Sequence, residues 1–101
     1  MIVAVVNFDL LAPLTTDEAR SMFEASAPNY QHVDGLRRKH FLLSEDGRTA
    51  GGVYLWESRQ QADALYDESW RQRLAARYGS EPRITFYDSQ VTVDPSSITV
   101  G

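Results

Sequence analysis

The fold is decided by the stretch Gly51-Gly52-Val53-Tyr54-Leu55-Trp56-Glu57-Ser58. Its β-branched and aromatic residues predict a strand, and its last residue is of a type that begins helices. Alternation directs Tyr54 and Trp56 to one face of that strand. The other face receives Val53 and Leu55, so both faces are apolar. A strand of this kind must be covered on both sides, which predicts a central strand that leads into a helix.

Length and composition indicate a single domain over residues 1–101. Hydrophobic residues make up 43% of the chain, which allows a small core that association with a second copy would enlarge. The net charge is −4, and the one basic run, Arg37-Arg38-Lys39, alternates between the faces of a strand, so we expect no nucleic-acid partner. Cysteine is absent, which excludes disulfides, thiolate catalysis and Cys-ligated metals.

The sequence shows no membrane or export signal. No segment has the apolar length of a membrane span. Met1 leads directly into a strand instead of a charged and then apolar signal peptide. We therefore expect a cytoplasmic protein with no membrane partner.

Hydrophobic periodicity predicts four strands and two helices. The strands are expected at 2–8, 36–43, 49–57 and 83–93, and the helices between 15 and 28 and between 58 and 79. Thr15 with Glu18, and Ser58 with Gln61, have the spacing of capping boxes. Gly79 is expected to end the second helix. Asp67-Glu68-Ser69 could also interrupt this helix and start a new turn, and the sequence leaves the two possibilities equal.

The order of these elements predicts an α+β fold. A β-α-β-β-α-β chain folds most simply as a ferredoxin-like subunit, with a four-stranded antiparallel sheet and both helices on one face. A hairpin turn at 45–48, with Asp-Gly at its centre, joins the two middle strands. The face without helices would still be apolar along 2–8 and 49–57. We therefore expect a homodimer in which the sheets of two copies pack together.

Several segments resemble one known family. The residues concerned are Gly35-Leu36, the string 50–58, Ala62, Ala64, Tyr66, Tyr87-Asp88 and Val93-Asp94. Together they resemble the YdhR-like monooxygenase family of the dimeric α+β barrel superfamily. The resemblance implies a dimer whose two sheets form a barrel, with a pocket between sheet and helices in each subunit. The superfamily includes cofactor-free oxygenases of quinone and polyketide chemistry, haem-degrading enzymes, isomerases and members without a known activity.

His40 is the candidate general base, because the pKa of histidine lies near neutrality. It occupies the middle of the strand 36–43, where its direction is fixed, whereas His32 falls in a loop. The catalytic interpretation has His40 hydrogen-bonded to an acidic phenol or enol. The alternative is a structural histidine on the sheet that is satisfied by a neighbour.

Aromatic residues are more numerous than a small core needs. Tyr54 and Trp56 are expected to orient a flat ligand through their hydroxyl and indole groups. Further substrate contacts are expected from Tyr66, Trp70, Phe86 and Tyr87. The alternative is that these rings only fill the core, and this is the favoured interpretation for Trp70 and Phe86.

Asn7 is a polar residue near the end of a buried strand, and it is a candidate partner for an oxyanion. Its position is similar to that of the asparagine over the haem in haem-degrading relatives. Those relatives also have an axial histidine, and none follows Trp56 here, which argues against haem. Histidine pairs and carboxylate pairs at ligand spacing are absent, as is a phosphate-binding loop. We expect no metal and no cofactor.

The leading hypothesis is a cofactor-independent monooxygenase that acts with O₂ on a small aromatic or quinol-like substrate. One alternative is a non-catalytic dimer that binds a small ligand or serves a stress response. A second alternative is an isomerase or lyase that uses the same pocket without oxygen.

Overall fold

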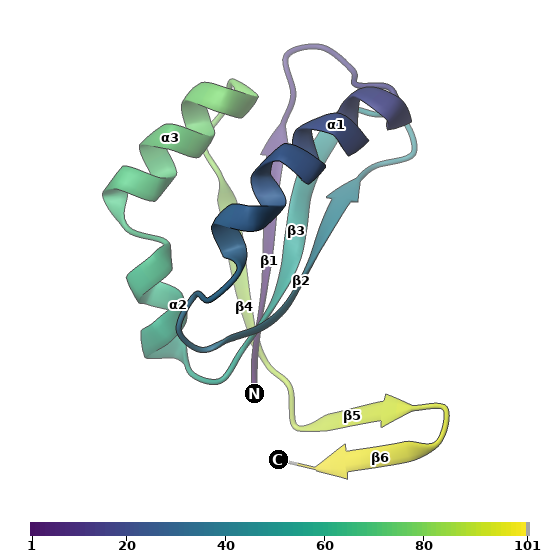
Figure 1. Cartoon of the computed structure of the whole chain (residues 1–101), viewed down its shortest axis with the longest axis vertical. Coiled ribbons are helices and arrows are strands. Elements are labelled where there is room, and N and C mark those ends of the chain that lie inside the picture. The colour runs from purple at the N-terminus through teal and green to yellow at the C-terminus, as the bar shows by residue number, and fades with distance from the viewer. Residues whose placement is uncertain (101) are drawn as a thin grey trace.

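The computed structural model describes residues 1–100, and Gly101, the last residue of the expected domain, lies outside the described part. Its main elements are β1 (Ile2–Asp9), α1 (Thr16–Ser26), η1 (Ala27–Tyr30), β2 (Leu36–Leu43), β3 (Thr49–Trp56), α2 (Arg59–Leu65), α3 (Glu68–Tyr78) and β4 (Arg83–Asp88). The four strands form an antiparallel sheet in the order β2-β3-β1-β4, and the helices cover one face of it (Figure 1). The expected ferredoxin-like α+β subunit is confirmed.

The centre of the sheet is the pair β1 and β3. Their register places Ala4 opposite Tyr54 and Ile2 opposite Trp56. These side chains point to the helices, and Tyr54 and Trp56 are buried. The alternate residues Val53 and Leu55 point to the bare face and remain partly exposed in the single chain. β3 is thus the central strand that its sequence predicts.

The helix boundaries follow local capping. Thr15 and Glu18 form the expected capping box, and the Ser58 hydroxyl accepts a hydrogen bond from the Gln61 amide. Gly79 ends α3 with φ of +83°, a conformation that glycine adopts without strain. Asp67 caps α3 by accepting a hydrogen bond from the Trp70 amide at 2.8 Å. The segment expected to form the second helix is therefore interrupted at Asp67 and forms two helices, α2 and α3.

The fourth strand is shorter than expected. Strand 83–93 was predicted, but β4 ends at Asp88, and β5 (Val91–Asp94) pairs with β6 (Ser97–Val100) in a separate two-stranded sheet. The reason is the length of the partner strand. β1 begins at Ile2, which pairs with Asp88, so a longer β4 would have no strand beside it. The chain instead turns away and projects as a hairpin (Figure 1).

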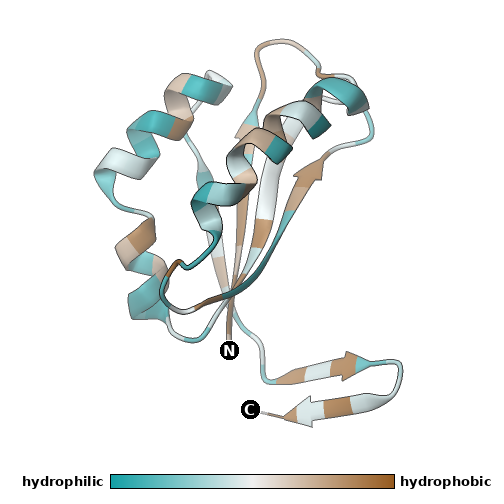
Figure 2. Ribbon diagram, in the orientation of Figure 1, coloured by the Kyte–Doolittle hydropathy of each residue, from teal (hydrophilic) through white to brown (hydrophobic). Residues whose placement is uncertain are grey.

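Two apolar surfaces remain uncovered in the single chain. One is the bare face of the sheet. The other is on the β5–β6 hairpin. Hydrophobic residues alternate with more polar ones along both of its strands (Figure 2), so the hydrophobic side chains lie on one side of the hairpin. The exposed side chains of the hairpin are Val91, Val93, Ile98 and Val100. No helix within residues 1–100 is long and apolar enough to cross a membrane.

Candidate functional site

Six rings gather between the sheet and the helices, and we call them the aromatic cluster. They come from η1, β3, the α2–α3 segment and β4: Tyr30, Tyr54, Trp56, Tyr66, Trp70 and Phe86. Tyr54 and Trp56 stack with parallel planes, and Tyr66 meets both edge to face at 5.3 and 5.7 Å between centroids. The structure therefore brings together five residues predicted for the site, and it adds Tyr30, which the sequence pattern did not indicate.

The polar groups of the cluster satisfy one another. The Trp56 indole donates to the Tyr66 hydroxyl at 3.1 Å, and the Trp70 indole donates to the Tyr30 hydroxyl at 3.2 Å. Burial raises the pKa of Tyr54 and also that of Tyr66, so both phenols stay neutral at physiological pH. The rings of the cluster therefore pack against one another, and both indole N–H groups already donate hydrogen bonds within it.

His40, Asn7 and Tyr87 lie on the opposite face of the sheet. The β2–β3 register pairs His40 with Val53, whose side chain points away from the helices. Asn7 pairs with Gly51, and Tyr87 alternates with Phe86, so both also project to the bare face. The single pocket expected to contain these residues together with Tyr54 and Trp56 does not form within one subunit, because strand alternation separates them.

Lys39 is the polar side chain that does reach the aromatic cluster. It pairs with Tyr54 in the β2–β3 register and therefore shares the helix-covered face. Its Nζ lies 3.4 Å from the centroid of the Tyr30 ring, 3.9 Å from Phe41 and 4.5 Å from Tyr54. Sequence analysis noted Lys39 only as part of a basic run that alternates between the faces of a strand, and gave it no role in a site. The signal that could have identified it is its spacing of two residues from Phe41, which puts both side chains on the same face of the strand.

Two cavities adjoin Lys39. The inner one, between the sheet and the helices, has a volume of ≈ 10 Å³, which is room for about one water. The outer one, which we call the β2-edge cavity, has a volume of ≈ 300 Å³ and lies between β2 and the segment 27–32. Its walls include the rings of Tyr30 and Phe41 and the side chains of His32, Arg38 and Lys39. A cavity of this size lies at the lower end of the range for small-ligand sites.

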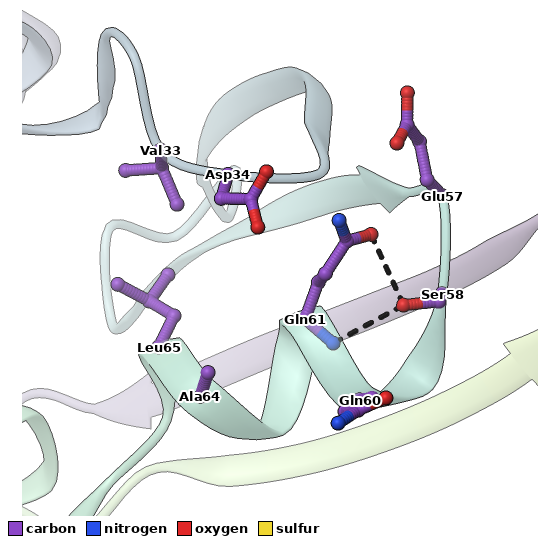
Figure 3. Close-up of a pocket in the computed structure, with 8 residues that line it drawn as sticks. All are labelled: Val33, Asp34, Glu57, Ser58, Gln60, Gln61, Ala64 and Leu65. Carbon is purple, nitrogen blue, oxygen red and sulfur yellow. Dashed lines mark hydrogen bonds between the residues drawn. The ribbon is translucent and has the colours of Figure 1, made fainter.

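A larger pocket of ≈ 720 Å³ opens where β3 enters α2. One wall is α2 and the other is the segment Val33–Asp34 (Figure 3). Four of its eight lining residues carry a carboxylate or an amide. The Gln61 side chain is held by a hydrogen bond from the Ser58 hydroxyl at 3.0 Å. Glu57, at its rim, forms an ion pair with Arg37 at 2.8 Å. Sequence analysis did not identify this pocket.

No group of three histidine, aspartate or glutamate side chains within residues 1–100 is arranged to hold a metal ion. The polar groups nearest the aromatic cluster are instead an amine and several phenols. Such groups can bind an anion or exchange a proton.

The fold and the aromatic site define a small α+β protein of the ferredoxin-like class. The chain belongs to the family described as "Putative mono-oxygenase ydhR", whose model matches residues 3–101. Comparison with curated proteins gives no significant match.

Solved structures show the same fold. One is a monooxygenase from the gene ActVA-Orf6 of Streptomyces coelicolor in complex with nanaomycin D (TM-score 0.69, 22% identity, 93% of this chain and 91% of that chain). Another is SnoaB, a cofactor-independent oxygenase from Streptomyces nogalater (TM-score 0.64, 16% identity, 91% of this chain and 95% of that chain). A third is NE2512, a protein of unknown function from Nitrosomonas europaea (TM-score 0.65, 13% identity, 95% of this chain and 95% of that chain). At these identities the likeness concerns the fold alone.

Proposed function

We propose that this protein is a cofactor-independent monooxygenase acting on a small, electron-rich aromatic hydroxyl compound, such as a phenol or a hydroquinone. The observation that carries the proposal is the β2-edge cavity, whose inner wall is formed by the rings of Tyr30 and Phe41. Flat aromatic ligands stack well on such a wall. The larger pocket at the start of α2 is less suited, since no aromatic ring lines it.

Two comparisons support the reaction class. The family is described as one of mono-oxygenases, and SnoaB, which shares the fold, is a cofactor-independent oxygenase. In such a reaction a phenol and O₂ give a quinone and H₂O. A ring C–H becomes a C=O that holds one atom of O₂, the phenolic C–OH becomes the second C=O, and the other atom of O₂ leaves as water with the two hydrogens. The substrate supplies the electrons, so no flavin or metal is needed. The protein has to bind the anion of the substrate, exclude water and stabilise the charge that develops on oxygen.

The roles of the predicted site residues follow from their positions. Tyr54 and Trp56 are assigned to the wall behind the cavity, since Tyr54 meets the Tyr30 ring edge to face at 5.9 Å. Tyr66 and Trp70 hold this wall through their hydrogen bonds. His40 and Asn7 are on the other face of the sheet, so we give them no part in this cavity.

Oxygen consumption tests the proposal. A Clark electrode is used with a panel of phenols and hydroquinones in the presence of a chelator, and autoxidation is subtracted with heat-denatured protein. We expect saturable O₂ uptake, with one oxygen atom from ¹⁸O₂ in the product. Binding without O₂ uptake would leave a ligand-binding protein, and substrate turnover without O₂ would indicate an isomerase or lyase.

We also propose that the working unit is a homodimer. The bare face of the sheet and the apolar side of the β5–β6 hairpin support this, because a single chain leaves both exposed. A two-stranded hairpin by itself is only marginally stable in water, so the hairpin needs a surface to pack against.

A further inference from the structure

Lys39 is held in place by three rings. Of the ten lysine and arginine residues in the chain, it is the only lysine. Its side chain crosses the helix-covered face of the sheet to reach Tyr30, Phe41 and Tyr54. Gly52 leaves the room for this path: a Cβ there would lie 3.2 Å from Lys39 Cε, closer than ordinary contact. The amine therefore has a defined position against the rings.

The amine has no anionic partner. Within residues 1–100, Lys39 takes part in no ion pair and no side-chain hydrogen bond. Neither adjoining cavity is lined by a carboxylate. The other titratable and charged groups that line the two cavities are phenols, an imidazole and arginines, namely Tyr30, Tyr54, Tyr78, His32, Arg37, Arg38 and Arg77. An ammonium among such neighbours lacks the counter-ion that buried charges normally have.

A lysine can do here what an arginine cannot. A guanidinium remains protonated at every physiological pH, whereas a desolvated amine can lose and regain a proton near neutrality. Burial, and to a lesser extent the charge of Arg77, lowers the pKa of Lys39 to about 7. The three rings then favour the ammonium through cation–π contacts once a proton has arrived. Both forms of Lys39 are accessible at neutral pH.

We propose that Lys39 is the general base for an acidic hydroxyl group of a ligand bound in the β2-edge cavity. The O–H bond of a phenol, hydroquinone or enol breaks, its electron pair stays on oxygen, and the proton moves to Nζ. The ammonium, held by Tyr30, Phe41 and Tyr54, then pairs with the oxyanion and replaces the missing counter-ion. This inference rests on the proposed function for the later step with O₂, and it names the base and the ionised form of the substrate.

Proton uptake on binding tests the proposal without oxygen chemistry. The probe is 4-nitrophenol under anaerobic conditions, at a pH above the pKa values of both the probe and Lys39. Calorimetry in buffers of different ionisation enthalpy then measures the protons exchanged. We expect the wild-type protein to take up about one proton per phenolate bound, because the neutral amine becomes an ammonium on pairing. Binding without proton uptake, or no binding in the millimolar range, would overturn the proposal.

Three variants sharpen the test. Lys39→Met removes the amine and should weaken phenolate binding at least about tenfold, as expected for a lost charge-assisted hydrogen bond. Lys39→Arg keeps the charge and should bind phenolate without proton uptake. Arg73→Met, on an exposed part of α3, removes one positive charge away from both cavities and should behave as wild type.

The outcomes for Lys39 and for the oxygenase are distinguishable. Phenolate binding with proton uptake but no O₂ consumption on any substrate would support Lys39 and refute the oxygenase. O₂ consumption that is unchanged in rate and pH profile in Lys39→Met would refute the base and leave the oxygenase standing.

Discussion

At the residue scale, Lys39 makes folding stability depend on pH. The pKa of its amine falls from 10.5 to about 7 on folding. Below pH 7 both folded and unfolded chains carry the ammonium, and the full cost of burying it is present. Between pH 7 and about 10 the unfolded chain binds more protons. Stability therefore rises with pH in this window, by at most about 1.4 kcal/mol per pH unit.

Thermal unfolding at pH 7, 8 and 9 checks this expectation. The melting temperature of the wild-type protein should rise relative to that of Lys39→Met, in which other titrations are the same. Parallel curves for the two proteins would show that the amine is not desolvated.

Tyr66 offers a second prediction, through the acceptor it provides for the buried Trp56 indole. Tyr66→Phe keeps the ring and leaves that indole without an acceptor, which should cost about 1–3 kcal/mol. Urea denaturation measures the loss. Tyr87→Phe, on an exposed tyrosine, is the matched control, and equal values for the two variants would contradict the importance of the bond.

The sequence predicted that Tyr54 and Trp56 lie together, but it did not predict that Lys39 is the polar side chain beside them. Alternation along each strand showed that Tyr54 and Trp56 share a face. Which face of β2 joins them depends on the register across the hairpin, and this register selects Lys39 in place of His40. Tyr30 was not predicted because it belongs to a short 3₁₀ turn, which has no hydrophobic period to recognise.

At the element scale, capping divides the second predicted helix. Asp67 begins α3 by accepting the Trp70 amide. Asp67→Ala should reduce stability by about 0.5–2 kcal/mol, since a lost N-cap leaves an unpaired amide. Chemical denaturation measures this, with Glu24→Ala on the exposed side of α1 as the control. A loss no larger than that of the control would mean that α2 and α3 do not depend on the cap.

The ends of a strand were predictable where its partner strand is as long as its own run of strand-forming residues. β2 matches its expected bounds, and β1 and β3 each differ from theirs by one residue. The prediction failed at the end of β4, where Val91 and Val93 continue a strand pattern beyond the start of β1. The strand propensity of a segment is set by its own residues, whereas its pairing also depends on which strand lies beside it in the sheet.

At the scale of the whole molecule, the homodimer should depend on the hairpin. Val93 is 69% exposed in the single chain, on the apolar side of the β5–β6 pair. Val93→Asp should weaken association, because dimer formation would bury the carboxylate without a partner. Sedimentation across a dilution series measures the shift.

Thr92→Asp is the matched control, since its side chain lies on the other side of the same strand. It should leave association unchanged. A wild-type chain that is monomeric at micromolar concentration would refute the dimer altogether, and equal effects of the two variants would place the contact elsewhere.

The central position of β1 also has a consequence for how the chain is made. β1 precedes the other three strands of the sheet and leaves the ribosome before them, whereas one of its two neighbours, β4, is the last of the four. Its pairing is therefore among the least local in the fold, and such contacts form slowly. Until residues 83–88 emerge, one edge of β1 has no partner and is open to pairing with another nascent chain. When the protein is overproduced, we therefore expect aggregation to begin with chains whose β1 is exposed before β4 has been made, and not with the folded domain.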